Sequence, residues 1–322
     1  MKREAGTPAI SVVIPLFNKG PYIRRTLTSV LAQTFQDFIV LVVDDGSTDE
    51  GPEVVQSLRE PRIAYLRQNN QGPGSARNTG LARVQSPFVA FLDADDEWSP
   101  EFLQVTYDLI TQNPVASVST GYYLSPQNLP SHRIYSLPPG IYSCSASDRV
   151  ERVITLWRFI SPCTTLIRTE IVKKYGGYYE KNHICNGEDG HFQLKLLMNE
   201  KVYIDNEPLM TIHSECSDLY IPFKQGQPLP LPAYLVEPDD VISFTPQEKR
   251  NLIHRVLARL ALDQAWHSAI RGQGAQARHL LQRFPLAAAF PKKYYLTRLA
   301  AGLAPLMPWV QWAYQWRKDR SF

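Results

Sequence analysis

Four carboxylates follow directly on an apolar run in the stretch Val89–Trp98, V-A-F-L-D-A-D-D-E-W. They belong to Asp93, Asp95, Asp96 and Glu97. Like charges this close together repel one another, so a cation is expected among them. Carboxylate oxygens are hard ligands that suit Mg2+ or Mn2+, with water and the phosphates of a nucleotide completing the shell. A lone D-x-D is also common in solvated acidic loops, so the rest of the chain must decide between these interpretations.

Two more polar clusters come straight after apolar, β-branched runs. The first run is I-S-V-V-I-P-L-F-N at 10–18, and the second is F-I-V-L-V-V-D-D-G-S-T-D at 38–49. Helical spacing of apolar residues follows each run, and strands that alternate with helices indicate a parallel sheet covered on both faces. Ligands bind such sheets at the carboxyl ends of the strands. Pro15–Asn18, Asp44–Gly46 and Asp93–Asp96 should therefore converge on one crevice, which suits a nucleotide.

The remaining pattern predicts the elements that position these clusters. A third strand is expected at 62–67, and a glycine-rich loop that enters a helix at 71–81. A fourth strand is expected at 88–92, and a helix N-capped by Ser99 should follow it. Residues 113–147 favour strands and loops without a clear order. Beyond them the pattern predicts a helix at 150–160, a strand at 162–167, a short helix at 170–175, and a helix that begins near 188.

Several function classes are excluded by missing motifs. No G-x-G-x-x-G follows the first strand and no G-x-x-x-x-G-K-[ST] occurs, so dinucleotide-dependent hydride transfer and P-loop chemistry are excluded. The four cysteines form no C-x-x-C pair, which argues against a zinc site and favours reduced structural thiols. They are Cys144, Cys163, Cys185 and Cys216.

Charge divides the chain into two parts. Residues 1–247 carry 21 Lys and Arg against 28 Asp and Glu, whereas residues 248–322 carry 13 against three. We expect a catalytic domain at 1–245 and a basic helical region at 246–322. The N-terminus lacks the apolar core of a secretory signal and no apolar stretch of 18 residues occurs, so a cytoplasmic protein is expected.

Five segments in order resemble family 2 of the glycosyltransferases, which are inverting enzymes with the GT-A fold. The segments are S-V-V-I-P-L-F-N, V-V-D-D-G-S-T-D, G-S-A-R-N-T-G-L, F-L-D-A-D-D-E-W and G-E-D-G-H-F-Q-L. Each one alone is a weak signal, but the series is specific and covers roughly residues 9–215. The resemblance implies a nucleotide-binding half at 9–112 and an acceptor half at 113–245.

The resemblance also implies which residues hold the donor. Asp45 would contact the nucleobase with Asp44 beside it, and Pro15 and Phe17 would line the pocket for base and ribose. Arg77 would face the donor, where a guanidinium group suits phosphate or sugar oxygens.

Roles for the metal and for the proton follow from the same likeness. Asp95 is implied as the direct ligand of Mn2+ or Mg2+, and Asp93 as a contact to ribose or metal. His213 is either a further metal ligand or a structural residue. Asp189 is implied as the general base, although acidic residues at a helix start, such as Glu188, also serve the helix dipole.

The implied reaction moves a sugar from a nucleotide sugar, a UDP sugar being expected, to a hydroxyl of a glycan or lipid-linked acceptor. Synthesis of a cell-surface polysaccharide is the expected setting. A single addition is favoured, because the Q-x-x-R-W motif of polymerising relatives is missing. A sugar nucleotidyltransferase would need a glycine-rich signature near the first strand. A non-catalytic nucleotide-sugar-binding or scaffold protein would not need Asp189.

The basic region 246–322 favours helices at 246–284, followed by an aromatic stretch. Tyr294–Lys318 holds three of the six tryptophans between basic clusters, and two prolines interrupt it too strongly for a membrane span. Aromatic residues flanked by Lys and Arg suit peripheral contact of 285–322 with an anionic membrane at the inner face of the cell membrane. The alternative is a helical appendage packed on the catalytic domain. No nucleic-acid-binding module accompanies the charge, so no nucleic-acid partner is expected.

Overall fold

The structure is a computed structural model that describes residues 6–216 and 230–303. The described residues form two compact units, one from 6–145 with 151–216 and the other from 146–150 with 230–303. The predicted boundary at 245/246 is therefore too late. Two short helices ahead of it, α10 (Ala233–Val236) and α11 (Pro238–Phe244), pack against α12 (Arg250–Ile270) and belong to the second unit.

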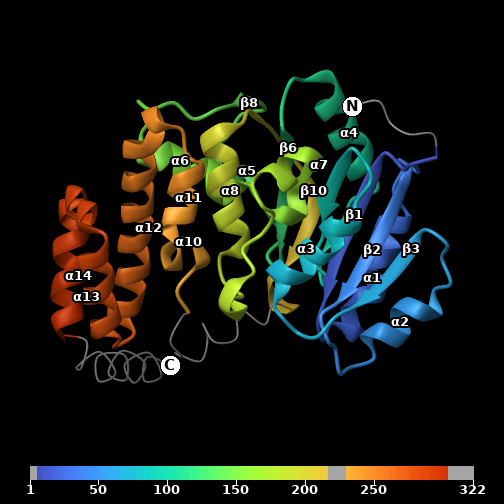
Figure 1. Ribbon diagram of the computed structural model, residues 1–322, viewed down its shortest axis with the longest axis horizontal. Coiled ribbons are helices and arrows are strands. Elements are labelled where there is room, and N and C mark those ends of the chain that lie inside the picture. The colour runs from blue at the N-terminus through green and yellow to red at the C-terminus, as the bar shows by residue number, and fades with distance from the viewer. Residues whose placement is uncertain (1–5, 217–229, 304–322) are drawn as a thin grey trace, which may run out of the picture. The chain divides into compact units, whose positions relative to one another are not determined.

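The first unit is built on one sheet, and its strands β1, β2 and β3 lie side by side in blue in Figure 1. The order across the sheet is β3-β2-β1-β4-β9-β6-β10-β5, with β7 beside β6 and β8 beside β10. The strands are β1 (Ile10–Leu16), β2 (Phe38–Asp44), β3 (Ile63–Arg67), β4 (Phe88–Phe91), β5 (Glu97–Trp98), β6 (Ser117–Ser125), β7 (Leu129–Pro130), β8 (Gly140–Tyr142), β9 (Thr165–Arg168) and β10 (Val202–His213).

The register brings the predicted polar clusters to one edge. Strand β1 runs parallel to β2 and to β4, and Ile10 lies opposite both Phe38 and Phe88. Strand β3 continues the parallel arrangement beside β2. Strand β10 is parallel to β6, whereas β9 joins the two halves of the sheet by antiparallel pairing. The expected α/β fold with a mostly parallel sheet flanked by helices is confirmed.

Helices cover both faces of the parallel strands because β1 presents apolar side chains on each face. Val12 and Ile14 belong to the same core cluster as Ile23 of α1, whereas Val13 lies against Gly80 of α3 on the other face. The helices of this part are α1 (Gly20–Leu31), α2 (Gly51–Ser57), α3 (Pro73–Arg83), α4 (Phe102–Gln112), α5 (His132–Tyr135), α6 (Val150–Phe159), α7 (Thr169–Lys174) and α8 (Glu188–Asn199).

Two predicted boundaries differ from the structure. Ser99 is not an N-cap, because α4 begins at Phe102 after a turn in which the carbonyl of Ser99 accepts the amide of Phe102. The strand predicted at 162–167 begins only at Thr165. A 3-10 turn, η1 (Pro162–Thr164), occupies the preceding residues, since proline favours a helical start.

The second unit is a helical bundle, drawn in orange and red in Figure 1. Helix α12 contacts α13 (Gly274–Arg283) and α14 (Pro291–Leu303), which also contact each other. Among the residues described, none of the helices is both long and apolar enough to span a bilayer. The remainder of the segment expected to meet a membrane, from residue 304 onward, lies outside the described residues.

Candidate active site

The acidic turn Asp93-Ala94-Asp95-Asp96 lies at the carboxyl end of β4 and is held in place by α1. The hydroxyl of Thr26, which is fully buried, donates to the carbonyls of Ala94 at 3.0 Å and Asp96 at 2.8 Å. The backbone amide of Asp96 also donates to the carbonyl of Asp93 at 3.1 Å. The carboxylates therefore project from a turn whose backbone is fixed by a helix side chain.

Two cationic side chains lie against the first two carboxylates of this acidic turn. Lys19 Nζ is 2.9 Å from Asp95 Oδ2, and Arg77 Nη2 is 2.7 Å from Asp93 Oδ1. The second guanidinium nitrogen, Nη1 of Arg77, is 2.8 Å from Oε1 of Glu188 at the start of α8. Burial and the charge of Asp93 raise the pKa of Asp95, and Lys19 works in the opposite direction. Arg77 thus joins the acidic turn to α8, and its contact with donor phosphates stays a prediction.

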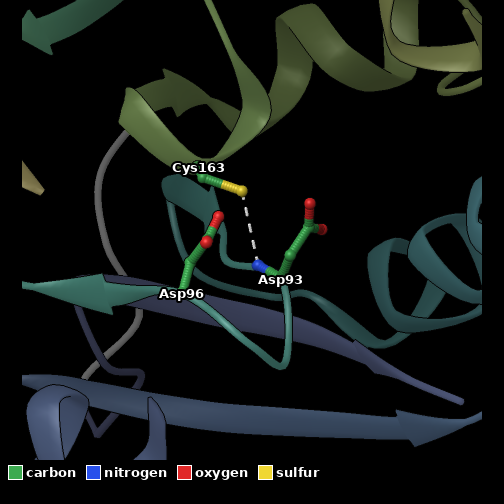
Figure 2. Close-up of side chains that lie close together, drawn as sticks. All are labelled: Asp93, Asp96 and Cys163. Carbon is green, nitrogen blue, oxygen red and sulfur yellow. Dashed lines mark hydrogen bonds between the residues drawn. The ribbon is translucent and has the colours of Figure 1, made fainter. Parts of the chain in front are cut away.

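The carboxylate of Asp96 lies beside the buried thiol of Cys163, as Figure 2 shows. The amide of Asp93 donates to Cys163 Sγ at 3.3 Å, and potential ligand atoms of Asp93, Asp96 and Cys163 lie within 4.8 Å of one another. Burial raises the pKa of Asp96 well above its ordinary value, and Asp93 and Asp95 add to the effect. Burial likewise raises the pKa of Cys163, so the sulfur stays a protonated thiol. The carboxylates of the turn fit a hard divalent cation, whereas the thiol does not.

The imidazole of His213 is held between two glutamates. Its Nε2 lies 2.8 Å from Glu97 Oε1 and its Nδ1 lies 3.0 Å from Glu215 Oε1. Its backbone amide donates to Asp96 Oδ1 at 2.9 Å. The hydrogen bond with His213 lowers the pKa of Glu215 to about 2. A metal bound by this ring would have to replace one of the two glutamates, so the predicted ligand role of His213 stays a prediction.

Asp45 lies at the end of β2 and fixes the glycine-rich loop before α3. Its Oδ1 accepts the side-chain amide of Gln68 at 2.7 Å and the backbone amide of Gln71 at 2.9 Å. Its Oδ2 accepts the backbone amide of Gly72 at 2.8 Å. The side chain predicted to contact a nucleobase therefore also shapes the loop that leads to Arg77.

The other predicted donor residues surround the ends of β1 and β2. Asp44 is fully buried and accepts hydrogen bonds from the hydroxyl of Tyr65 at 2.7 Å and the amide of Ser47 at 2.8 Å. Pro15 is partly buried, and the ring of Phe17 is 42% exposed just beyond β1. An exposed aromatic ring at a strand end suits stacking with a flat base.

Asp189 lies in the first turn of α8, next to the buried Glu188. It is partly exposed, and its Oδ1 accepts the amide of Gly190 at 2.7 Å. Burial raises the pKa of Asp189 even though Arg77 works in the opposite direction. Burial and the charge of Asp189 raise the pKa of Glu188 to about 7. A carboxylate that is partly exposed and has a raised pKa suits a general base.

The sequence did not single out every member of this cluster. Lys19 could have been noticed, because a basic residue just after the end of β1 faces the carboxylates of the other strand ends. Glu188 was explained by the helix dipole alone, although it binds Arg77. Cys163 gave no signal, since 70 residues separate it from Asp93 and no spacing rule joins them.

Comparison with known proteins identifies a family and several relatives of this chain. The model of the family "Glycosyl transferase family 2" matches residues 11–176. A glycosyltransferase of Rickettsia prowazekii is 29% identical over 212 residues, which cover 65% of this chain and 65% of that protein. The succinoglycan biosynthesis protein ExoW of Rhizobium meliloti is 52% identical over 110 residues, or 32% of this chain and 34% of ExoW.

Solved structures share the fold. TarS 1-349 of S. aureus, in complex with UDP-GlcNAc, superposes with a TM-score of 0.66 at 18% identity and covers 91% of this chain and 90% of its own. The mannosyltransferase PcManGT of Pyrobaculum calidifontis, in complex with GDP-Man and Mn2+, gives a TM-score of 0.54 at 17% identity over 97% of this chain and 85% of its own. With the GT-A fold, the acidic turn after β4 and the family match over more than half of its length, the chain belongs to glycosyl transferase family 2.

Proposed function

We propose that this protein is an inverting, metal-dependent glycosyltransferase that moves a sugar from a UDP sugar to a hydroxyl of a glycan or lipid-linked acceptor. Membership of family 2 supports the reaction class. The fold shared with TarS in complex with UDP-GlcNAc supports a uridine nucleotide, and the likeness to the succinoglycan protein ExoW supports synthesis of a cell-surface polysaccharide.

One observation carries the proposal: the acidic turn and the start of α8 are joined through a single arginine. Arg77 binds Asp93 with one nitrogen and Glu188 with another, and Asp189 is the next residue. The carboxylates that suit a cation are thus tied by direct contacts to the carboxylate that suits a base. A binding protein has no need for that second carboxylate.

The residues divide the work as follows. Phe17 and Asp45 would hold the nucleobase, and Asp93 and Asp95 would hold Mn2+ or Mg2+. A divalent cation held there would neutralise charge on the leaving nucleotide. Asp189 accepts the proton of the acceptor hydroxyl, whose oxygen attacks the anomeric carbon on the side opposite the leaving group. The configuration inverts in one displacement.

Calorimetric titration of UDP, GDP and their sugars, with and without Mn2+, tests the donor site. We expect one nucleotide to bind, more tightly with Mn2+, and the Mn2+-dependent gain to disappear in Asp95→Asn. Asp108→Asn, which removes a carboxylate on α4, is the control and should retain the Mn2+-dependent gain in nucleotide affinity. If none of the nucleotides binds, the proposed activity is wrong while the family and fold remain.

We also propose that the second unit brings the enzyme to its acceptor by peripheral contact with the inner face of the cell membrane. The support lies in the outward face of α14. Four apolar side chains on that helix are between 43% and 67% exposed: Tyr295, Leu296, Leu299 and Leu303. Residues 274–303 contain no Asp or Glu, so the charged side chains of this segment are all basic.

A further inference from the structure

The side chain of Lys19 lies on the carboxylate to which the proposed function assigns a divalent cation. Its Nζ is 2.9 Å from Asp95 Oδ2 and donates to the carbonyl of Cys216 at 2.6 Å. The side chains of Lys19 and Asp95 are only 14% and 12% exposed. We propose that the ammonium group of Lys19 competes with the divalent cation for Asp95, so that Mn2+ or Mg2+ binds by displacing it. This inference rests on the metal use proposed above.

The backbone of Lys19 is fixed, so competition involves the side chain alone. Lys19 is the N-cap residue of α1, and its carbonyl accepts the amides of Tyr22 and Ile23, both at 2.9 Å. The next amide, of Gly20, donates to Asp49 Oδ2 at 2.7 Å. A four-carbon stem that extends from a fixed backbone can swing its charged end without disturbing α1.

The two cations of the acidic turn differ in how firmly they are held. Arg77 is almost fully buried and spans two carboxylates, Asp93 and Glu188, in a fixed fork. The ammonium of Lys19 is a compact charge on a flexible stem, with no fork to fix its direction at Asp95. When a cation enters the turn, Lys19 is therefore the group that leaves.

Charge makes the two occupants mutually exclusive. A divalent cation and an ammonium group on one carboxylate would repel each other strongly in this buried setting. Each must therefore weaken the binding of the other by the same factor, since such coupling is reciprocal. Lys19 sets the metal affinity of the enzyme by competing at Asp95, and its removal should tighten metal binding.

The test measures binding of Mn2+ alone to the full chain, without nucleotide, by calorimetry or by the electron paramagnetic resonance of free Mn2+. At about pH 8, where carboxylates are ionised, Lys19→Met should tighten Mn2+ binding about tenfold or more. Lys19→Gln keeps a donor for the Cys216 carbonyl and should show the same gain. Arg24→Met removes a positive charge from the exposed side of α1 and should change nothing.

Each outcome either supports or overturns competition between Lys19 and Mn2+ at Asp95. A gain in both Lys19 variants and none in Arg24→Met supports competition at Asp95. Equal or weaker Mn2+ binding in folded Lys19 variants overturns it, because the ammonium would then be irrelevant to the cation or would hold Asp95 in place for it. Absence of Mn2+ binding in every variant also overturns it. Titration of UDP without metal reports separately on the donor site, so failure of the proposed function is distinguishable.

Discussion

At the scale of single residues, the carboxylates of the acidic turn differ in what already binds them. Asp93 is fixed by the guanidinium of Arg77, and Asp96 accepts a backbone amide and lies beside a buried thiol. Asp95 meets the more easily displaced ammonium of Lys19. We therefore expect Asp95 to be the carboxylate whose partner changes when a divalent cation binds, with Asp93 as the second proposed ligand and Asp96 shaping the turn around them.

The assignment of Asp189 as general base predicts a specific kinetic defect. Asp189→Asn should lower kcat by about 10²- to 10⁴-fold with nearly unchanged donor binding, because the amide cannot accept the proton. Since burial raises the pKa of Asp189, the wild-type kcat should fall on the acid side at a pH above that of an ordinary aspartate, as the base becomes protonated. Steady-state kinetics against pH, with calorimetry of the donor, measure both effects.

Glu188→Gln is the companion variant, and it should behave differently. Its carboxylate binds the buried Arg77, so its loss should lower thermal stability, whereas Asp189→Asn should barely change the melting temperature. Loss of donor binding together with transfer in Asp189→Asn would mean that this residue is structural. Unchanged transfer in Asp189→Asn would mean that Asp189 is not the base, whereas donor binding without transfer in the wild-type chain would favour the non-catalytic binding or scaffold role.

At the scale of elements, the close packing of α3 against the segment before α8 requires glycine at position 74. A Cβ at Gly74, in the first turn of α3, would overlap the carbonyl oxygen of Tyr179 and lie 3.4 Å from Cγ of Glu188. A larger residue must therefore push α3 away from α8. Such a shift would pull Arg77 from Glu188, because the two side chains come from these two helices.

Gly74→Ala should consequently destabilise the first unit by about 1 to 3 kcal/mol, the usual cost of overpacking. It should also weaken donor binding by disturbing Arg77. Gly302→Ala is the matched control, since a Cβ there meets nothing within 4 Å, and alanine in a helix should stabilise by up to about 1 kcal/mol. Chemical unfolding of both variants measures these changes. An unaltered unfolding curve for Gly74→Ala would show that the helices adapt to the methyl group.

The elements show how far the sequence can predict this site. The apolar runs and helical spacing predicted the strands β1 to β4 and placed Asp45 and Asp93 at one edge, because side-chain period and strand direction are local properties. The pairing of Arg77 with Glu188 and the approach of Cys163 to Asp93 join residues 111 and 70 positions apart. These contacts arise because η1 and α8 pack against the residues at the strand ends, and no spacing rule predicts such packing.

At the scale of the whole molecule, the basic charge of the chain is concentrated where the second unit offers an apolar face. The inner side of α14 buries Thr297, Ala300 and Ala301 against the bundle, and the outer side exposes Tyr295 and Leu299. A helix whose outward face is apolar needs a partner for that face. Its flanking Lys and Arg residues favour an anionic lipid surface over a neutral one.

Deleting residues 285–322 would be a poor test of membrane contact, because it removes the buried side of α14 and disturbs the bundle. Leu299→Glu is sharper, since Leu299 is 62% exposed and its loss leaves the bundle core intact. We expect the wild-type chain to sediment with vesicles of phosphatidylcholine and phosphatidylglycerol but not with phosphatidylcholine alone, and Leu299→Glu to lose most of this binding. Ile141→Glu, at an apolar position 46% exposed on β8, is the control and should bind like wild type. Equal binding by Leu299→Glu would exclude α14 as the contact surface, and a change in its oligomeric state instead would assign this face to a second copy of the chain.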